Sequence, residues 1–198
     1  MTKVFIDGSA GTTGLRIYER LSGRKDLELL ILPDELRKNN DARRQMLSLA
    51  DIAFLCLPDA AAVEAVSLID NDHVAVIDTS TAHRTNDAWA YGFAELSPAH
   101  REAIRNSKRI ANPGCHASGF IASVCPLVAR GVIPAEMALT SYSLTGYSGG
   151  GKKMIAQYEA PDRSPLLKGP RQYGLTQQHK HLKEMVKLCG LQTAPVFC

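Results

Sequence analysis

Three glycines spaced three residues apart, Gly8, Gly11 and Gly14, separate an apolar segment from a helix-like one near the N-terminus. The segment before them, KVFIDG, is typical of a strand, and the segment after them repeats apolar residues at the spacing of one helix face. In such a unit the glycines permit a tight turn, a close approach of the backbone to a diphosphate, and packing of the helix on the strand. The alternative is a glycine turn that binds nothing. We expect a dinucleotide-binding turn made of Gly8, Ser9, Gly11, Thr12, Thr13 and Gly14.

Apolar segments alternate with helix-like segments over the first half of the chain. Continuous apolar runs follow the glycine turn at residues 27–32, 51–58 and 73–80. Such runs are typical of strands buried on both faces of a parallel sheet. Helix-like segments at 40–50 and 59–69 lie between them, the second with Asp59 as its expected N-cap. The alternation predicts an α/β fold with a doubly wound, Rossmann-type parallel sheet in a first domain at 1–112.

The pattern changes after residue 112, where we place the domain boundary. Residues 115–131 are predicted to form a helix, and residues 137–146 alternate in the manner of a half-exposed strand. We expect them to be followed by a glycine-rich loop at 147–153, an irregular segment at 158–174 and a helix at 176–190. This predicts an α+β domain at 113–198. Because it has few strands to pair and the chain stops in the apolar APVFC, we expect a truncated form of a longer protein.

Composition and charge exclude several classes of protein. The formal net charge of +3 is small, which argues against a nucleic-acid partner. No apolar run is long enough to span a bilayer, and the N-terminus enters a strand at once, so we expect neither a membrane span nor a leader. The five cysteines are odd in number and form no CxxC pair, which disfavours a disulfide framework and a metal site. We expect a cytoplasmic protein that acts on a small molecule.

Cys115 directly follows a proline and a glycine and is expected in the first turn of the helix at 115–131. A helix N-terminus favours the thiolate, and its N–H groups can stabilise an oxyanion. His116 is adjacent, but neighbouring side chains on a helix do not face each other, so the base should come from elsewhere in the fold. The alternative is a structural cysteine. We interpret Cys115 as a nucleophile and the cysteines at 56, 125 and 189 as packing residues.

The sequence HKHLKEM places His181 and Glu184 three residues apart, hence on one helix face, with His179 off that face. One histidine can serve as a general acid or base near the thiol. A polar, solvated start of a helix explains the same residues equally well. A metal site would need histidines four residues apart with more carboxylates nearby, so we expect none.

Five motifs together resemble one known family. GSAGTTG, DTSTAHR, ANPGCHASG, SGGGKKMI and GLTQQHKHLKEM are similar to the N-acetyl-gamma-glutamyl-phosphate reductases, in the shorter of their two sequence types. The match covers the whole chain in the expected order. The Asn-Pro-Gly-Cys motif is specific, because the related aspartate-semialdehyde dehydrogenases have an Asn-Cys pair at this place.

The resemblance implies NADPH-dependent reduction of an acyl phosphate to an aldehyde, a step of arginine biosynthesis. It implies that Cys115 forms a thioester and that His179 is the acid/base residue. The implied substrate-binding residues are Arg84, Lys152, His181 and Glu184. The family also implies a homo-oligomer, a dimer or a tetramer, with its subunit contacts in the second domain.

Alternatives stay open beside this resemblance. A dinucleotide-binding module without chemistry would need neither Cys115 nor His179. A sister enzyme acting on aspartyl phosphate and an inactive fragment with a partial fold are the others. The residues alone also leave the cofactor open between NAD and NADP: Asp34 and Glu35 favour the first, and Arg37 and Lys38 suit a 2′-phosphate.

Overall fold

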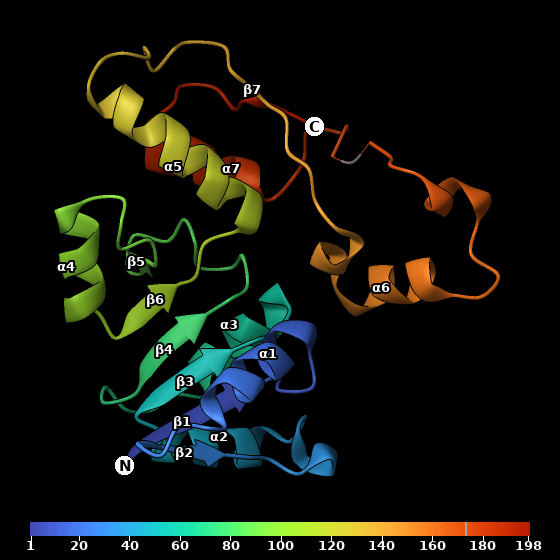
Figure 1. Cartoon of the computed structure of the whole chain (residues 1–198). Coiled ribbons are helices and arrows are strands. Elements are labelled where there is room, and N and C mark those ends of the chain that lie inside the picture. The colour runs from blue at the N-terminus through green and yellow to red at the C-terminus, as the bar shows by residue number, and fades with distance from the viewer. Residues whose placement is uncertain (173) are drawn as a thin grey trace. The chain divides into compact units, whose positions relative to one another are not determined.

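The computed structural model describes residues 1–172 and 174–198. Tyr173, which belongs to the segment predicted to be irregular, lies outside the described residues. The chain forms two compact units, Met1–Pro113 and Gly114–Cys198, which are coloured blue to green and green to red in Figure 1. The sequence analysis places its domain boundary between residues 112 and 113.

In the first unit, all of whose residues are described, six strands form one parallel sheet in the order β2-β1-β3-β4-β6-β5. The strands are β1 (Thr2–Asp7), β2 (Leu27–Leu30), β3 (Ile52–Leu55), β4 (Ala75–Asp78), β5 (Ala90–Tyr91) and β6 (Arg109–Ala111). This sheet confirms the predicted α/β fold. The strand order reverses between β1 and β3, and ligands of such sheets bind at the carboxyl ends of the strands at that point.

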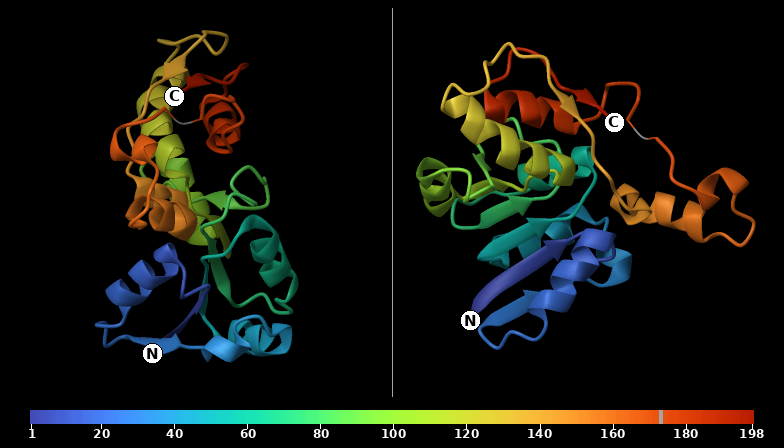
Figure 2. Two further views of the ribbon diagram at one scale, coloured as in Figure 1. Left: turned by 90° about the vertical axis from the view of Figure 1, so that its right-hand side faces the viewer. Right: turned by 45° about the horizontal axis from the view of Figure 1, so that its top comes forward.

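Helices cover both faces of this sheet: Figure 2 shows α1 on one face and α2 and α3 on the other. The helices are α1 (Thr12–Leu21), α2 (Asn40–Leu49), α3 (Asp59–Ser67) and α4 (Pro98–Asn106), with a short 3-10 helix, η1 (Asp34–Leu36). Phe5, Ala53 and Val76 occupy one register row and are fully buried with side chains of α2 and α3. In the opposite rows, Phe54 and Ile77 are half-buried. The main core of this unit therefore lies beneath α2 and α3.

Asp59 does not cap α3, contrary to the sequence prediction. The N-cap is Pro58, and Asp59 is the first helical residue. Its carboxylate accepts hydrogen bonds from the backbone N–H of Thr81, at 2.8 Å, and from the Thr81 hydroxyl, at 2.5 Å. The carboxylate therefore ties the start of α3 to the segment that follows β4.

The second unit pairs two helices with a short parallel ladder. Its elements are α5 (Cys115–Ala129), β7 (Thr140–Ser141), η2 (Tyr147–Gly150), α6 (Gly151–Glu159), η3 (Pro165–Lys168), α7 (His181–Cys189) and β8 (Val196–Phe197). α5 packs on α7 and buries Phe120 and Ile121, with Leu182 and Met185 buried on α7. β7 pairs with β8 through Thr140 opposite Val196.

Three predictions for this unit are wrong in part. The segment at 147–153 is not a loop: η2 leads directly into α6, and Gly151 makes the junction with a φ of +71°, which glycine adopts readily. The strand expected at 137–146 is reduced to β7. The helix expected from 176 begins at His181, because Gln177 has a φ of +56° and its side-chain amide bonds both the N–H and the C=O of Phe197, each at 2.8 Å.

Within the described residues, the structure contains no helix that is long and apolar enough to cross a membrane. The described part of the chain also holds no group of three or more histidine, cysteine or acidic side chains arranged to bind a metal ion.

Candidate active site

The glycine turn lies at the carboxyl end of β1, where the strand order reverses. Gly8 has a φ of +85°, and a Cβ atom at this residue would stand 2.3 Å from the carbonyl oxygen of Cys56. A Cβ atom at Gly14 would stand 2.4 Å from the carbonyl oxygen of Gly8. Both positions therefore require glycine.

The same turn fits the phosphates of a dinucleotide. The N-cap of α1 is Gly11, which has no side chain of its own to bond the first N–H groups of this helix. These N–H groups carry the positive end of the helix dipole. Of the three hydroxyl-bearing residues of the turn, Ser9 and Thr12 are half-buried and Thr13 is exposed.

A buried ion pair lies directly before the turn. Asp7, the last residue of β1, is 4 % exposed, and Arg43 on α2 is equally buried. The Arg43 Nε donates to the Asp7 carboxylate at 3.0 Å, and its Nη1 donates to Glu64 at 2.9 Å. Burial raises the pKa of Asp7, and the nearby guanidinium offsets part of that rise. The sequence analysis missed Arg43, although its place four residues before the buried Leu47 puts it on the same helix face.

The motif DTSTAHR folds around a second buried carboxylate, that of Asp78 at the end of β4. Asp78 accepts from the backbone N–H of Ser80 at 2.9 Å and from its hydroxyl at 2.6 Å, and lies 2.6 Å from His83 Nδ1. The His83 ring stacks on Trp89 with 4.1 Å between ring centroids. Arg84 is also buried and donates from Nη2 to the carbonyl oxygen of Thr79 at 2.8 Å. The guanidinium of the predicted anchoring arginine is therefore held against the backbone of its own motif.

Cys115 is the first residue of α5, as the sequence predicts, and its side chain is exposed. The residue before it, Gly114, is the N-cap, and its backbone N–H donates to the carboxylate of Glu184 at 2.9 Å. Glu184 lies on α7 and is 1 % exposed. A buried carboxylate 70 residues further along the chain thus fixes the start of the helix that carries the thiol.

The histidines of the second unit form a cluster. The ring centroids of His179 and His181 are 4.5 Å apart, and His116 lies 5.6 Å from His179 and 5.7 Å from His181. The ring of Phe197 lies against His116 and His179, at 5.2 and 4.8 Å. The sequence predicts His181 and Glu184 on one helix face, with His179 off that face and His116 set aside. The cluster is not predicted, because adjacency on a helix says nothing of contacts made by folding.

Two histidines of this cluster, His116 and His179, have pKa values below the ordinary value. Burial lowers the pKa of His116. Burial also lowers the pKa of His179, and the positive charges of His116 and Lys180 lower it further, while Glu184 opposes them. The neutral imidazole of His179, which is able to accept a proton, is thereby favoured.

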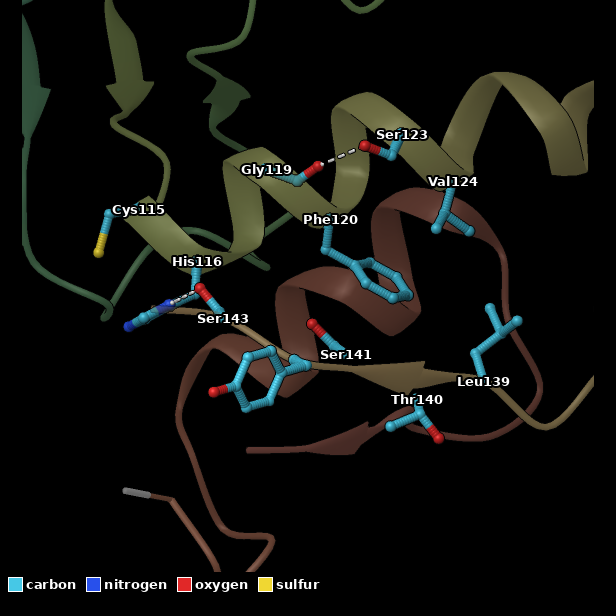
Figure 3. Close-up of a pocket in the computed structure, with 11 residues that line it drawn as sticks. Cys115, His116, Gly119, Phe120, Ser123, Val124, Leu139, Thr140, Ser141 and Ser143 are labelled. Carbon is cyan, nitrogen blue, oxygen red and sulfur yellow. Dashed lines mark hydrogen bonds between the residues drawn. The ribbon is translucent and has the colours of Figure 1, made fainter. Parts of the chain in front are cut away.

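An open pocket of about 370 Å³ adjoins Cys115 and His116 (Figure 3). Its walls come from α5 and from the segment around β7: Gly119, Phe120, Ser123, Val124, Leu139, Thr140, Ser141, Tyr142 and Ser143. The lining is a mixture of hydroxyl groups and apolar side chains. Lys152, the remaining predicted site residue, is exposed in the first turn of α6.

The other cysteines differ from Cys115 in their surroundings. Burial raises the pKa of Cys56 to about 11 and that of Cys189 to about 12. The half-buried Cys125 donates from its thiol to the carbonyl oxygen of Leu188 at 3.4 Å, and burial raises its pKa as well. A thiol reacts as the thiolate, so these side chains are poor nucleophiles.

Two family models match the chain. "Semialdehyde dehydrogenase, NAD binding domain" matches residues 33–106, and "Semialdehyde dehydrogenase, dimerisation domain" matches residues 115–197.

Curated relatives match nearly the whole chain. It is 46% identical over 201 residues to N-acetyl-gamma-glutamyl-phosphate reductase 2 of Nostoc sp., and 50% identical over 197 residues to N-acetyl-gamma-glutamyl-phosphate reductase of Mesorhizobium japonicum. Each match covers 98% of this chain but 62% and 63% of the relatives. The chain therefore spans less than two thirds of their length.

Solved structures of similar fold include an aspartate semialdehyde dehydrogenase from Francisella tularensis, with a TM-score of 0.60 and 13% identity, which covers all of this chain and 71% of that one. Another is an aspartate semialdehyde dehydrogenase with NADP from Candida albicans, with a TM-score of 0.58 and 16% identity, which covers all of this chain and 69% of that one. At these identities the likeness shows the fold.

Proposed function

The chain belongs to the semialdehyde dehydrogenase family, and from this premise we propose that it reduces N-acetyl-gamma-glutamyl phosphate to N-acetyl-glutamate 5-semialdehyde with NADPH, in arginine biosynthesis. The observation that carries the proposal is the exposed Cys115 at the start of α5, whose N-cap is anchored by Glu184. The relatives with 46–50% identity carry the reductase name, which supports this substrate over aspartyl phosphate.

The first step is acyl transfer to sulfur. His179, whose neutral form is favoured, accepts the proton of the Cys115 thiol. The thiolate attacks the acyl carbon, a C–S bond forms, and the bond from that carbon to the phosphate oxygen breaks. Inorganic phosphate leaves with that electron pair, and a thioester remains on Cys115.

The second step is reduction of the thioester. The nicotinamide, when bound, supplies the hydride that this carbon accepts. Backbone N–H groups at the start of α5 stabilise the oxyanion that results, and the protonated His179 can neutralise it. As the C–S bond then breaks, the hydroxyl proton returns to His179 and the aldehyde leaves. Cys115 and His179 are again the thiolate and the imidazolium that were present before the acyl transfer.

The remaining residues bind and position. The residues that would hold the pyrophosphate are Gly8, Ser9, Gly11, Thr12, Thr13 and Gly14. Arg37 and Lys38, exposed just beyond η1, are the candidates for the 2′-phosphate that distinguishes NADP. Arg84 and Lys152 suit the anionic groups of the substrate, because a guanidinium or ammonium pairs with phosphate or carboxylate. We assign His181 and Glu184 to support of the site.

We extend the proposal to organisation. Residues 1–113 form the nucleotide-binding domain, and residues 114–198 form the catalytic domain, which carries the contacts of a homo-oligomer, a dimer or a tetramer. The match of the dimerisation model to residues 115–197 supports this division. All five cysteines, each in the described part of the chain, are free thiols, which supports a reducing compartment such as the cytoplasm.

The reverse reaction tests the proposal. The chain is mixed with N-acetyl-glutamate semialdehyde, NADP and phosphate, and the absorbance of reduced nicotinamide is followed. We expect a signal that requires phosphate, that is lost in Cys115→Ser and that persists in the matched control Cys198→Ser. Turnover that survives in Cys115→Ser would refute the thioester mechanism. Turnover that proceeds equally well without phosphate would refute the acyl phosphate as the substrate. If the chain turns over aspartate semialdehyde faster than N-acetyl-glutamate semialdehyde, the proposed substrate is wrong and aspartyl phosphate takes its place.

A further inference from the structure

His116 lies beside the thiol in sequence but serves the cluster of histidines in the fold. Neighbouring residues on a helix point about 100° apart, so His116 and Cys115 face different sides of α5. Figure 3 shows the sulfur of Cys115 at the end of the helix and the His116 ring turned toward Ser143. On this side the ring meets His179, edge to face, with an interplanar angle of 89°.

Ser143 fixes the orientation of this ring. Its hydroxyl oxygen lies 2.8 Å from His116 Nδ1. Ser143 is itself held, since its backbone N–H donates to the carbonyl oxygen of Cys198 at 2.9 Å. Phe197 closes the cluster with its ring 5.2 Å from His116. A hydrogen bond on one side and ring packing on the other leave the imidazole little freedom to turn.

We propose that His116 is a positioning residue, which, held by Ser143, sets the orientation and the protonation of His179. The inference rests on the proposed function, in which His179 accepts the proton of the thiol. It adds a residue that acts through the base and not on the substrate.

The charges around His179 give the direction of this effect. His116 faces it from α5, and the His181 ring lies 4.5 Å from it at the start of α7. The positive charge of Lys180 lowers the pKa of His179, and the carboxylate of Glu184 raises it. Burial lowers the pKa of His116, whereas the pKa of His179 is lowered by burial and by the positive charge of His116. A protonated His116 therefore keeps the second proton off His179 until the solution is more acidic.

An NMR titration of the histidine ring signals between about pH 5 and about pH 8 tests this inference without any turnover. The six histidines give six ring signals, and single substitutions assign them. In His116→Phe, which keeps a ring but removes the charge, we expect the titration midpoint of His179 to rise by about half a pH unit. In Ser143→Ala, which frees the ring of His116, we expect a smaller rise.

A matched control comes from the first unit. His100 on α4 also has Nδ1 2.8 Å from a serine hydroxyl, that of Ser97. His100→Phe should leave the midpoint of His179 where it is. An unchanged midpoint in a folded His116→Phe would overturn the inference. If that variant fails to fold, as judged by circular dichroism, His116→Gln and Ser143→Ala decide in the same way.

The two proposals fail separately. A shifted midpoint in a chain that shows no phosphate-dependent turnover would refute the proposed function and leave the role of His116 standing. Turnover that depends on Cys115, together with an unshifted His179 midpoint, would support the proposed function and refute the role of His116. Where both hold, the acidic limb of the kcat profile in His116→Phe should move by the same amount as the midpoint.

Discussion

The candidate residues of the two units are gathered in different ways. In the first unit the glycine turn occupies Gly8 to Gly14, and its shape follows from backbone contacts within the turn and with Cys56, directly after β3. In the second unit the cluster joins His116 to His179 and His181, and Gly114 to Glu184. A turn of the first kind depends on local backbone geometry, whereas the second kind depends on the packing of α5 against α7.

Thiol reactivity should show the largest contrast between the units. Cys56 of the first unit has a pKa raised to about 11, and Cys115 of the second is exposed at a helix N-terminus. With iodoacetamide near neutral pH, we expect Cys115 to be modified at least about a hundredfold faster than Cys56, and also faster than the buried Cys189 of its own unit. Peptide mass spectrometry over time measures this. In urea, where the chain is unfolded, all the thiols should react at similar rates. Equal rates in the folded chain would contradict the predicted difference in thiol reactivity.

The buried ion pair offers a test that is confined to the first unit. Arg43→Ala leaves the carboxylate of Asp7 buried without its partner, so we expect a loss of about 3–5 kcal/mol in the free energy of unfolding. Urea unfolding followed by the fluorescence of Trp89, the single tryptophan, reports on this unit. The control is Arg44→Ala, whose exposed pair with Asp41 should be worth less than about 1 kcal/mol. Equal losses would mean that burial of the pair is not decisive.

Two glycine substitutions should change the stabilities of the two units in opposite directions. A methyl group at Gly14 would stand 2.4 Å from a backbone oxygen, so Gly14→Ala should destabilise the first unit by about 2 kcal/mol. Gly119 lies inside α5 with nothing within 4 Å of its would-be Cβ, so Gly119→Ala should stabilise the second unit by about 0.5–1 kcal/mol. Thermal unfolding followed by circular dichroism compares them. A stabilising Gly14→Ala would contradict the tight turn.

The smallest effect concerns pH and the second unit. The folded-state pKa values of His116 and His179 lie below the ordinary value of 6.5. The stability they contribute is therefore complete above that value and is lost as the pH falls through the folded-state pKa. Unfolding of a His116→Phe, His179→Phe double variant should depend less on pH below about 6.5 than unfolding of the parent chain. An identical dependence would show that other groups dominate.

Local patterns predict four of the six strands in the sheet of the first unit, β1 to β4, and the position of Cys115, but not β5 and β6. β1, β3 and β4 follow from continuous apolar runs, and the glycine turn follows from its spacing. The start of α7 could not be predicted in this way, because Gln177 bonds Phe197 instead of joining the helix. The spacing of apolar residues does not indicate such a contact. The Glu184 carboxylate on Gly114 and the approach of His116 to His179 escape prediction for the same reason. Asp59 has the residue type of a cap, but the Thr81 hydroxyl and N–H compete for its carboxylate.

The side-chain amide of Gln177 bonds the backbone N–H and C=O of Phe197 on the edge of β8 that does not face β7. It thereby makes the pair of hydrogen bonds that a neighbouring strand would make. These hydrogen bonds also hold the Phe197 ring in place, and that ring packs on His116 and His179. Loss of the Phe197 ring should therefore change the pKa values of these two imidazoles.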